Sequence, residues 1–326
     1  MSHVPEPFDR RDPEGAVAAI VKRCSNVGRW GPDDVRGTLN FLDAAKRVDG
    51  ARLVRRGVSF SLAQRFDASG PQKGWRRRTN PVHTMLDTGV DAEFGDQGFP
   101  HGIGGADDVI FMPLQASTQW DGLGHIFDHG QAYNGRRASQ VVTSEGDRVT
   151  GIETVADLIA GRGVLLDVGR MIGTDGELPD GFPITAEHLE RTLAAEGVSV
   201  GRGDLVCVRT GQLTRARREG WGDYAGGAAP GLSLTTADWL FESQIAGIAT
   251  DTWGFEVRPN EFDVLAFQPL HQVAIPHIGL FIGEMWDLDA LATDCAADGV
   301  YEFWLTAAPL PVTGAVGAPL NPIAVK

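Results

Sequence analysis

The sequence predicts an α/β fold, a mixed sheet covered by helices, on two observations. Continuous apolar runs such as 163–168 and 203–211 are typical of strands buried on both faces. Helical segments with recognisable ends separate these runs: the segment 185–196 begins at a Thr cap, Thr185, and ends at Gly197. Strands that alternate with helices indicate a sheet covered on at least one face.

The remaining elements follow from the same signals of periodicity, caps and turns. Further strands are expected at 56–62, 109–114, 245–252 and the first part of 301–314, and helices at 16–24, 43–46, 152–159 and 235–242. Residues 67–107 are rich in Gly, Pro, Arg and Asp and predict a long surface excursion. Its arginine run, 76–78, could attract an anionic substrate, but a solvated charge run or an intersubunit salt bridge is the favoured interpretation.

Composition narrows the function. We expect an N-terminal arm at 1–28 and one domain at 29–326; the length prior is about two domains, although single-domain chains of this size exist, and a hydrophobic content of 42% supports a large core. The net charge of −14 disfavours nucleic acid and anionic membranes as partners. Three separated cysteines suggest no disulfide framework, and we expect a cytoplasmic protein. No apolar run approaches the ~18 residues of a membrane helix.

The chemically densest stretch runs from Gln115 to His125 and also contains Gln119, Trp120 and Asp121. It follows the apolar run 109–114 and ends in a glycine-rich loop. In an extended backbone, side chains at odd positions share one face, so the two glutamines and the Asp converge while Trp120 turns to the other face. Such a set can hold a cation or a polar substrate.

This stretch resembles the H-x-G-T-H-x-D-x-x-x-H motif of the cyclase or kynurenine-formamidase-like family. Thr118, Asp121 and His125 are kept, while glutamine stands at both earlier histidine positions, 115 and 119. The resemblance covers roughly 29–326 and implies a swivelling β/β/α fold and a homodimer or homotetramer. It also implies a Zn or Mn ion held by Gln115, Gln119 and Asp121, with His125 as base or second ligand. Imidazole binds zinc better than an amide oxygen does, so the glutamines bear directly on the metal.

A second dense stretch contains His271 and Glu284. Glu284 follows a nearly continuous apolar run, and a carboxylate buried there needs a cation or a proton-sharing partner. The family has a His about a dozen residues before a Glu in this setting, both near the metal. The resemblance therefore assigns His271 as a metal ligand, and Glu284 as both a ligand and a catalytic residue.

Four further residues are candidates for substrate binding. Trp120 is expected to face an aromatic or cyclic substrate, and Tyr133 belongs to a Tyr-Asn-Gly element that resembles one beside the family's site. Arg209 ends a strand and could anchor a carboxylate, although a structural salt bridge is equally expected. Asp251 ends another apolar strand, where ligand sites of open α/β sheets lie, or else caps the next turn.

We therefore expect a hydrolase that opens a small amide, formamide or lactone. A divalent ion would activate water and His125 would take the proton, with Asp121 and Glu284 also catalytic. Two alternatives remain: a metal-independent lyase, isomerase or hydrolase of the same fold that uses His125 and Glu284, and a non-catalytic protein that binds small molecules.

Overall fold

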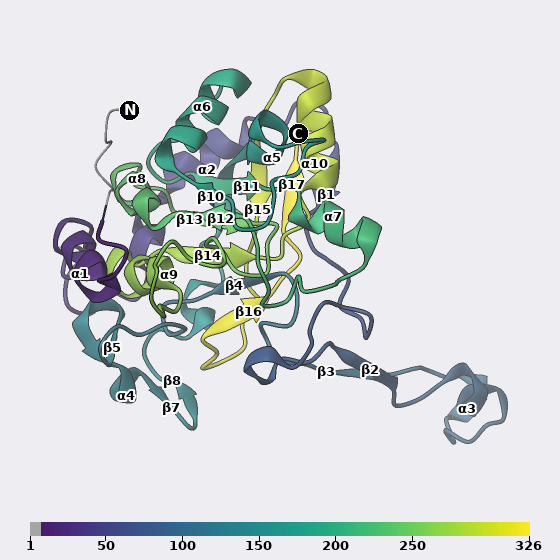
Figure 1. Ribbon diagram of the computed structural model, residues 1–326. Coiled ribbons are helices and arrows are strands. Elements are labelled where there is room, and N and C mark those ends of the chain that lie inside the picture. Colours follow the sequence, from purple (N-terminus) through teal and green to yellow (C-terminus); the bar gives the residue numbers. More distant parts are fainter. Residues whose placement is uncertain (1–7) are drawn as a thin grey trace.

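The structure, a computed structural model, describes residues 8–326, and a nine-stranded mixed sheet forms its centre (Figure 1). The strands follow one another across the sheet in the order β1 (Ser59–Ser61), β17 (Ile323–Val325), β15 (Glu302–Thr306), β9 (Ala160–Asp167), β11 (Leu205–Arg209), β13 (Gly247–Thr250), β14 (Phe281–Glu284), β4 (Gln119–Asp121) and β16 (Gly317–Pro319). The four strands from β9 to β14 are parallel to one another, and every other pairing is antiparallel. The predicted α/β class is confirmed.

Side chains on both faces of the parallel strands are buried. In β9, Val164 and Leu166 belong to one core cluster and Leu165, between them, to the other. The first core includes residues of α1 (Pro13–Arg23), α5 (Val168–Ile172), α6 (Ala186–Glu196), α8 (Ala237–Glu242) and α9 (Pro269–Val273), and the second includes residues of α10 (Asp289–Asp298). A strand covered on both faces has no solvent side, which explains the continuous apolar runs of the sequence.

The remaining α-helices and strands of this body are short. They are the helices α2 (Ala44–Ala51), α4 (Ala138–Val141) and α7 (Gln212–Glu219), and the short strands β5 (Gln131–Ala132), β6 (Arg136–Arg137), β7 (Val142–Thr143), β8 (Gly146–Asp147), β10 (Pro183–Ile184) and β12 (Gly231–Leu232). Helix α1 lies within the segment predicted as an N-terminal arm. Its residues Val17 and Ile20 are buried in the first core. Residues 1–7 of that segment lie outside the described part of the chain.

Most of the predicted elements are found close to their expected positions, with one clear miss among the helices. Helix α6 begins after Thr185 and ends at Gly197, whose φ of 65° suits glycine. The helix expected at 152–159 is instead a short 3₁₀ turn, Ile152–Val155. The carbonyl oxygen of Ile159 already accepts a hydrogen bond from the Ala307 N–H at 2.9 Å, so the sheet draws this backbone out of a helical path.

The apolar run 109–114 was predicted to be a buried strand, and this prediction is wrong. Strand β3 (Asp108–Phe111) pairs only with β2 (Val82–Met85), all eight residues are exposed, and Phe111 is 77% exposed. With α3 (Gly89–Glu93) at its end, this pair projects from the body as an arm, residues 82–111 (Figure 1). An apolar run alone does not show whether its partner strand lies in the core or outside it.

We expect the arm to be covered by a second copy of the chain in solution. Its exposed apolar side chains form a surface of the kind that marks protein interfaces: Val82, Met85, Leu86, Val90, Phe94, Phe99, Ile103, Val109, Ile110 and Phe111. Six carboxylates and no lysine or arginine lie in the arm, which disfavours nucleic acid and anionic membranes as partners. Replacing 86–107 with a short Gly-Ser turn should lower the number of chains per assembly, measured by light scattering. An unchanged number of chains with an unchanged circular dichroism spectrum would contradict this expectation.

Within residues 8–326, no helix has the length and apolar character needed to cross a membrane.

Candidate active site

The site is built on the antiparallel pair of β4 and β14. Gln119 lies opposite Glu284, and Asp121 lies opposite Ile282. Because side chains alternate along a strand, Gln119, Asp121 and Glu284 share one face of the sheet. The Gln119 amide joins the two carboxylates, with Nε2 donating to Glu284 Oε2 at 2.9 Å and to Asp121 Oδ1 at 3.2 Å. The alternation predicted for residues 119–121 is therefore confirmed.

Helix α9 brings His271 onto the same face. Its Nε2 lies 3.2 Å from Glu284 Oε1, and its Nδ1 lies 2.5 Å from Glu256 Oε1. Glu256 also accepts hydrogen bonds from the backbone N–H groups of Leu270 and His271, at 3.1 and 3.0 Å. The imidazole is thus fixed between two carboxylates, both almost completely buried.

His125 approaches the cluster from the loop that follows β4. Its Nε2 lies 3.6 Å from Asp121 Oδ1, and its side chain is 8% exposed. The backbone reverses here because the His125 N–H donates to the Gly122 carbonyl oxygen at 3.1 Å. The two distant stretches that the sequence singled out therefore meet: Asp121 and His125 from one, and His271 and Glu284 from the other.

Burial sets the protonation of this cluster. Desolvation, reinforced by the charge of Glu284, raises the pKa of Asp121 to about 7. Burial lowers the pKa of His125 well below its usual value, with Arg78 and Arg76 acting in the same direction, so His125 is neutral near pH 7. Burial acts against the charge of His271, but its hydrogen bonds to Glu256 and Glu284 prevail and raise its pKa to about 10. Asp121 can therefore gain or lose a proton near pH 7, and the imidazole of His125 beside it is neutral.

The cluster also offers donors for a metal ion. One ligand atom each from Asp121, His271 and Glu284 lies within 4.8 Å of the others. Among the described residues, Gln119 Oε1 is buried without a hydrogen-bond partner. Since the two ends of an amide have nearly the same shape, turning it over would present this oxygen to an ion between the carboxylates. Three side chains that offer oxygen and only one imidazole suit a hard divalent cation better than zinc.

Gln115, the other predicted ligand, lies at the margin of the site. It belongs to the turn before β4, so it does not continue the extended backbone of Gln119 and Asp121. Its amide lies beside Gly317, the residue paired with Asp121: a Cβ placed on Gly317 would be 3.1 Å from Gln115 Nε2. No hydrogen bond joins Gln115 to the cluster within residues 8–326.

Trp120 and Tyr133 have structural partners. The Trp120 indole N–H donates to the Ala307 carbonyl oxygen at 2.8 Å, and the ring packs edge-on against Trp286 at 4.9 Å, in the core behind the sheet. The expectation that Trp120 faces the substrate is therefore corrected, because alternation turns it away from Asp121. The buried Tyr133 O–H donates to Asp34 at 2.7 Å, and its ring lies where a Cβ on Gly279 would be, 2.4 Å from its Cε2.

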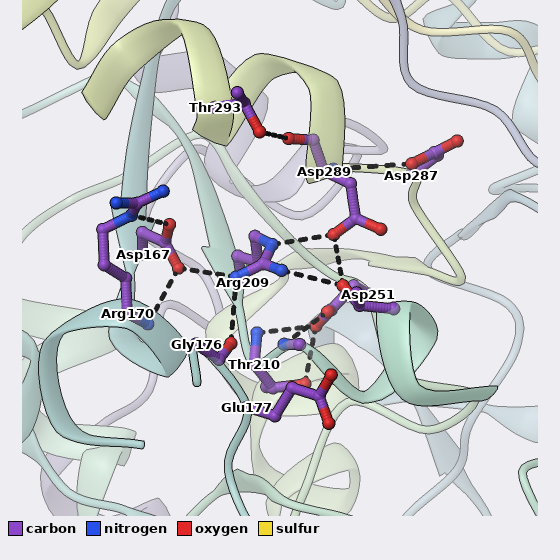
Figure 2. A network of polar contacts seen from close by, with 12 residues as sticks. Asp167, Arg170, Gly176, Glu177, Arg209, Thr210, Asp251, Asp287, Asp289 and Thr293 are labelled. Atoms are coloured by element: carbon purple, nitrogen blue, oxygen red, sulfur yellow. Dashed lines mark hydrogen bonds and ion pairs between the residues drawn. The ribbon is translucent and has the colours of Figure 1, made fainter. Parts of the chain in front are cut away.

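Arg209 and Asp251 belong to a separate polar network at the ends of the parallel strands (Figure 2). Arg209 pairs with Asp167 at 2.9 Å and with Asp289 at 2.8 Å. Asp251 accepts three hydrogen bonds at 2.8 Å, from the Thr210 N–H and hydroxyl and from the Gly211 N–H. The Arg209 contacts match the salt bridge considered as its structural alternative, whereas Asp251 caps the turn after β11 and not the turn that follows Asp251 itself.

Sequence reasoning missed two contributors to the site. Glu256 orients His271 from a distant loop, and its only sequence signal is a carboxylate between the apolar residues Phe255 and Val257. The run 76–78 was interpreted as solvated charge, yet Arg78 is 7% exposed and lowers the pKa of both Asp121 and His125. Only the fold shows that one member of the run is buried.

Comparison with known proteins places this geometry in a family. A family model described as "Putative cyclase" matches residues 46–257. The chain is 40% identical to a solved structure described as a novel cyclase, with a TM-score of 0.84 over 94% of this chain and 99% of the other. No functionally curated protein matches by sequence.

More distant structures share the fold. Isatin hydrolase A from Labrenzia aggregata, bound to benzyl benzoate, is 18% identical, with a TM-score of 0.59 over 85% of this chain and 96% of the other. A structure described as a predicted metal-dependent hydrolase from Bacillus stearothermophilus is 17% identical, with a TM-score of 0.52 over 83% of this chain and 98% of the other. At this identity they support the fold alone.

Proposed function

Because the chain belongs to the cyclase family, we propose that it is a hydrolase that opens a small amide, formamide or lactone bond. The observation that carries the proposal is the buried cluster of Asp121, His271 and Glu284 with His125 at its edge. Buried titratable groups with displaced pKa values concentrate at catalytic sites. The name of isatin hydrolase A, which shares the fold, supports a small cyclic or aromatic substrate.

The proposed roles follow from the protonation of each group. His125 is neutral and can accept a proton at Nε2 as a water oxygen attacks the carbonyl carbon. The same proton then passes to the leaving nitrogen or oxygen as the C–N or C–O bond breaks. Asp121 lies 3.6 Å from that Nε2 and, with a pKa of about 7, can relay the proton. Gln119 keeps the two carboxylates in place.

A divalent ion fits this site, with Asp121, His271, Glu284 and the Gln119 amide oxygen as its ligands. When bound, such an ion would polarise the carbonyl and lower the pKa of water toward neutrality. Since oxygen donors predominate, we propose manganese rather than zinc. Glu256 would orient the His271 ring through Nδ1, as carboxylates commonly do for metal-binding histidines.

A metal-independent enzyme of the same fold is a second candidate, because one observation favours it. Both ring nitrogens of His271 contact carboxylates, and its raised pKa keeps the ring protonated near neutrality. A protonated imidazole cannot bind a metal, but it supplies positive charge beside Glu284 without one. In this mechanism His125 and Asp121 move the proton, and His271 offsets the carboxylate charge.

One experiment tests the proposal and separates the two candidates. Protein purified without chelator is analysed for bound metal and assayed with lactones, cyclic imides and aryl formamides, before and after treatment with EDTA and Mn²⁺. We expect ring opening or deformylation that EDTA abolishes and Mn²⁺ restores. Turnover that persists without metal would support the second candidate. Saturable binding of these compounds with no turnover by the Mn²⁺-loaded protein would overturn the hydrolase proposal and indicate a binding protein.

A further inference from the structure

Within the described residues, three arginines near the catalytic cluster form no ion pair, Arg76, Arg78 and Arg258, and the last two are buried or half-buried. Arg78 is 7% exposed and Arg258 is half-buried. Within residues 8–326, no carboxylate oxygen lies within 4.0 Å of either guanidinium, although most other buried or half-buried cations of the chain are paired, as Arg162 and Arg209 are. The polar partner found for Arg258 is the Gly226 carbonyl oxygen, at 2.6 Å. A buried cation is costly unless it is paired, so this pattern suggests a place for an anion from outside the chain.

The aromatic surroundings hold these guanidinium groups in place. Arg78 Cζ lies 5.2 Å from the centre of the Trp253 ring, and Arg258 Cζ lies 5.6 Å from the same ring. Arg258 also lies 5.1 Å from the ring of Trp75, which packs edge-on against Trp253 at 5.0 Å. The Trp253 N–H donates to Gln72 Oε1 at 3.2 Å. Two cations share one fixed ring, so the positive charge is already positioned before any ligand arrives.

This arrangement lies beside the catalytic cluster. Trp253 is two residues before Phe255, whose N–H donates to Glu284 Oε1 at 3.2 Å. A groove lined by Arg258, Phe267 and Gln268 extends to Glu256, the residue that holds His271. A molecule in this groove can therefore contact Arg258 while another part of it lies beside Glu256.

The carboxylates of the cluster form no ion pair with Arg78 or Arg258 within the described residues, although Glu256 and Glu284 act on Arg258 at longer range. Asp121 and Glu284 accept hydrogen bonds from Gln119 at 3.2 and 2.9 Å. The charge of Arg78 acts at longer range, lowering the pKa of Asp121 and of His125.

We infer that Arg78 and Arg258 form a binding site for a carboxylate group of the substrate, and that Trp75 and Trp253 contact its planar or aromatic part. The inference rests on the proposed hydrolase function and narrows it to anionic substrates. Two planar guanidinium groups match the fork of a carboxylate, and the indole rings favour an aromatic acid over a compact inorganic anion.

The test measures binding without turnover, using benzoate and phthalate as probes and benzamide as their neutral counterpart. Isothermal titration should show that both acids bind wild-type protein and that benzamide binds at least 10-fold more weakly. Arg78→Gln should weaken phthalate binding roughly 10–100-fold, as expected for a lost charge-assisted pair. Arg77→Gln is the matched control, because Arg77 is the exposed neighbour in the same run. It should bind phthalate like the wild type.

Three outcomes would overturn the inference: benzamide binding as tightly as benzoate, inorganic phosphate binding more tightly than either acid, or equal effects of the two substitutions. If Arg78→Gln unfolds, Arg258→Gln provides the same comparison, with circular dichroism as the check on folding. Acid binding that depends on these arginines, in a protein that hydrolyses nothing, would retain the inference and refute the hydrolase proposal. Hydrolysis of neutral substrates alone, without acid binding, would do the reverse.

Discussion

Replacing Asp121 with Asn should reduce turnover sharply and leave the metal-free protein as stable as the wild type, or more stable, at pH 8. The side chain is buried, and its pKa of about 7 means that folding opposes its ionisation. Asn keeps an oxygen that can accept the hydrogen bond from Gln119 but cannot relay a proton. We expect kcat to fall by roughly 10²–10⁴, and the free energy of unfolding at pH 8 to rise by about 1–3 kcal/mol.

The pH dependence of this stability difference gives the sharper test. The folded-state pKa of Asp121 is raised from 3.8 to about 7, so the folded protein binds the proton more tightly than the unfolded chain. Wild-type stability should therefore fall, relative to Asp121→Asn, as pH rises from about 4 to 7, and the difference should be constant above that. Urea unfolding of both proteins across this range measures it. A variant less stable than the wild type at pH 8 would contradict this account of Asp121.

The second large effect is expected at Glu256, on stability as well as activity. Glu256→Ala leaves three groups without their acceptor: His271 Nδ1 and the N–H groups of Leu270 and His271. In the metal-free protein His271 is protonated near neutrality, so this change leaves a buried charge with one partner fewer. We expect the free energy of unfolding to fall by about 3–5 kcal/mol. Denaturant titration at pH 7 measures the loss.

Glu256→Gln is the conservative comparison, since it keeps an acceptor oxygen but removes the charge. The folded-state pKa of His271, about 10, lies above its unfolded value of 6.5. Its stabilising contribution is therefore full below about pH 6.5 and is lost as pH rises through 10. Without the Glu256 charge this loss should begin at a lower pH in the Gln variant. Superimposable pH–stability curves for wild type and Glu256→Gln would show that Glu256 does not hold the imidazolium.

The sequence predicted those parts of the fold and site that depend on local pattern. Period-two alternation placed Gln119 and Asp121 on one face, and a Thr cap with a terminal glycine located α6. Pairing His271 with Glu284 needed the family resemblance, because a spacing of thirteen residues has no geometric meaning until α9 and β14 are known to pack together. Local pattern was enough to predict arrangements that depend on residues close together in the sequence. It was not enough to predict contacts between distant segments.

The misses share one physical cause: burial is decided by partners far along the chain. The run 109–114 has the composition of a core strand, but its partner, β2, projects with it into solvent. Arginine is a residue type usually found at the surface, but Arg78 packs against the Trp253 ring and is buried. Glu256 gave only a weak local signal, a carboxylate between apolar residues, because its role depends on the distant His271.

The close packing of Gly279 restricts how this family member can change through evolution. A Cβ on Gly37 would lie 2.1 Å from the Gly279 oxygen, and one on Gly279 would lie 2.4 Å from the Tyr133 ring. Gly279 ends the π-helical turn that continues α9, the helix that carries His271. Any larger residue at position 37 would therefore displace the segment that positions the His271 ring. We expect substitutions at position 37 to be restricted in evolution, although this residue does not line the site.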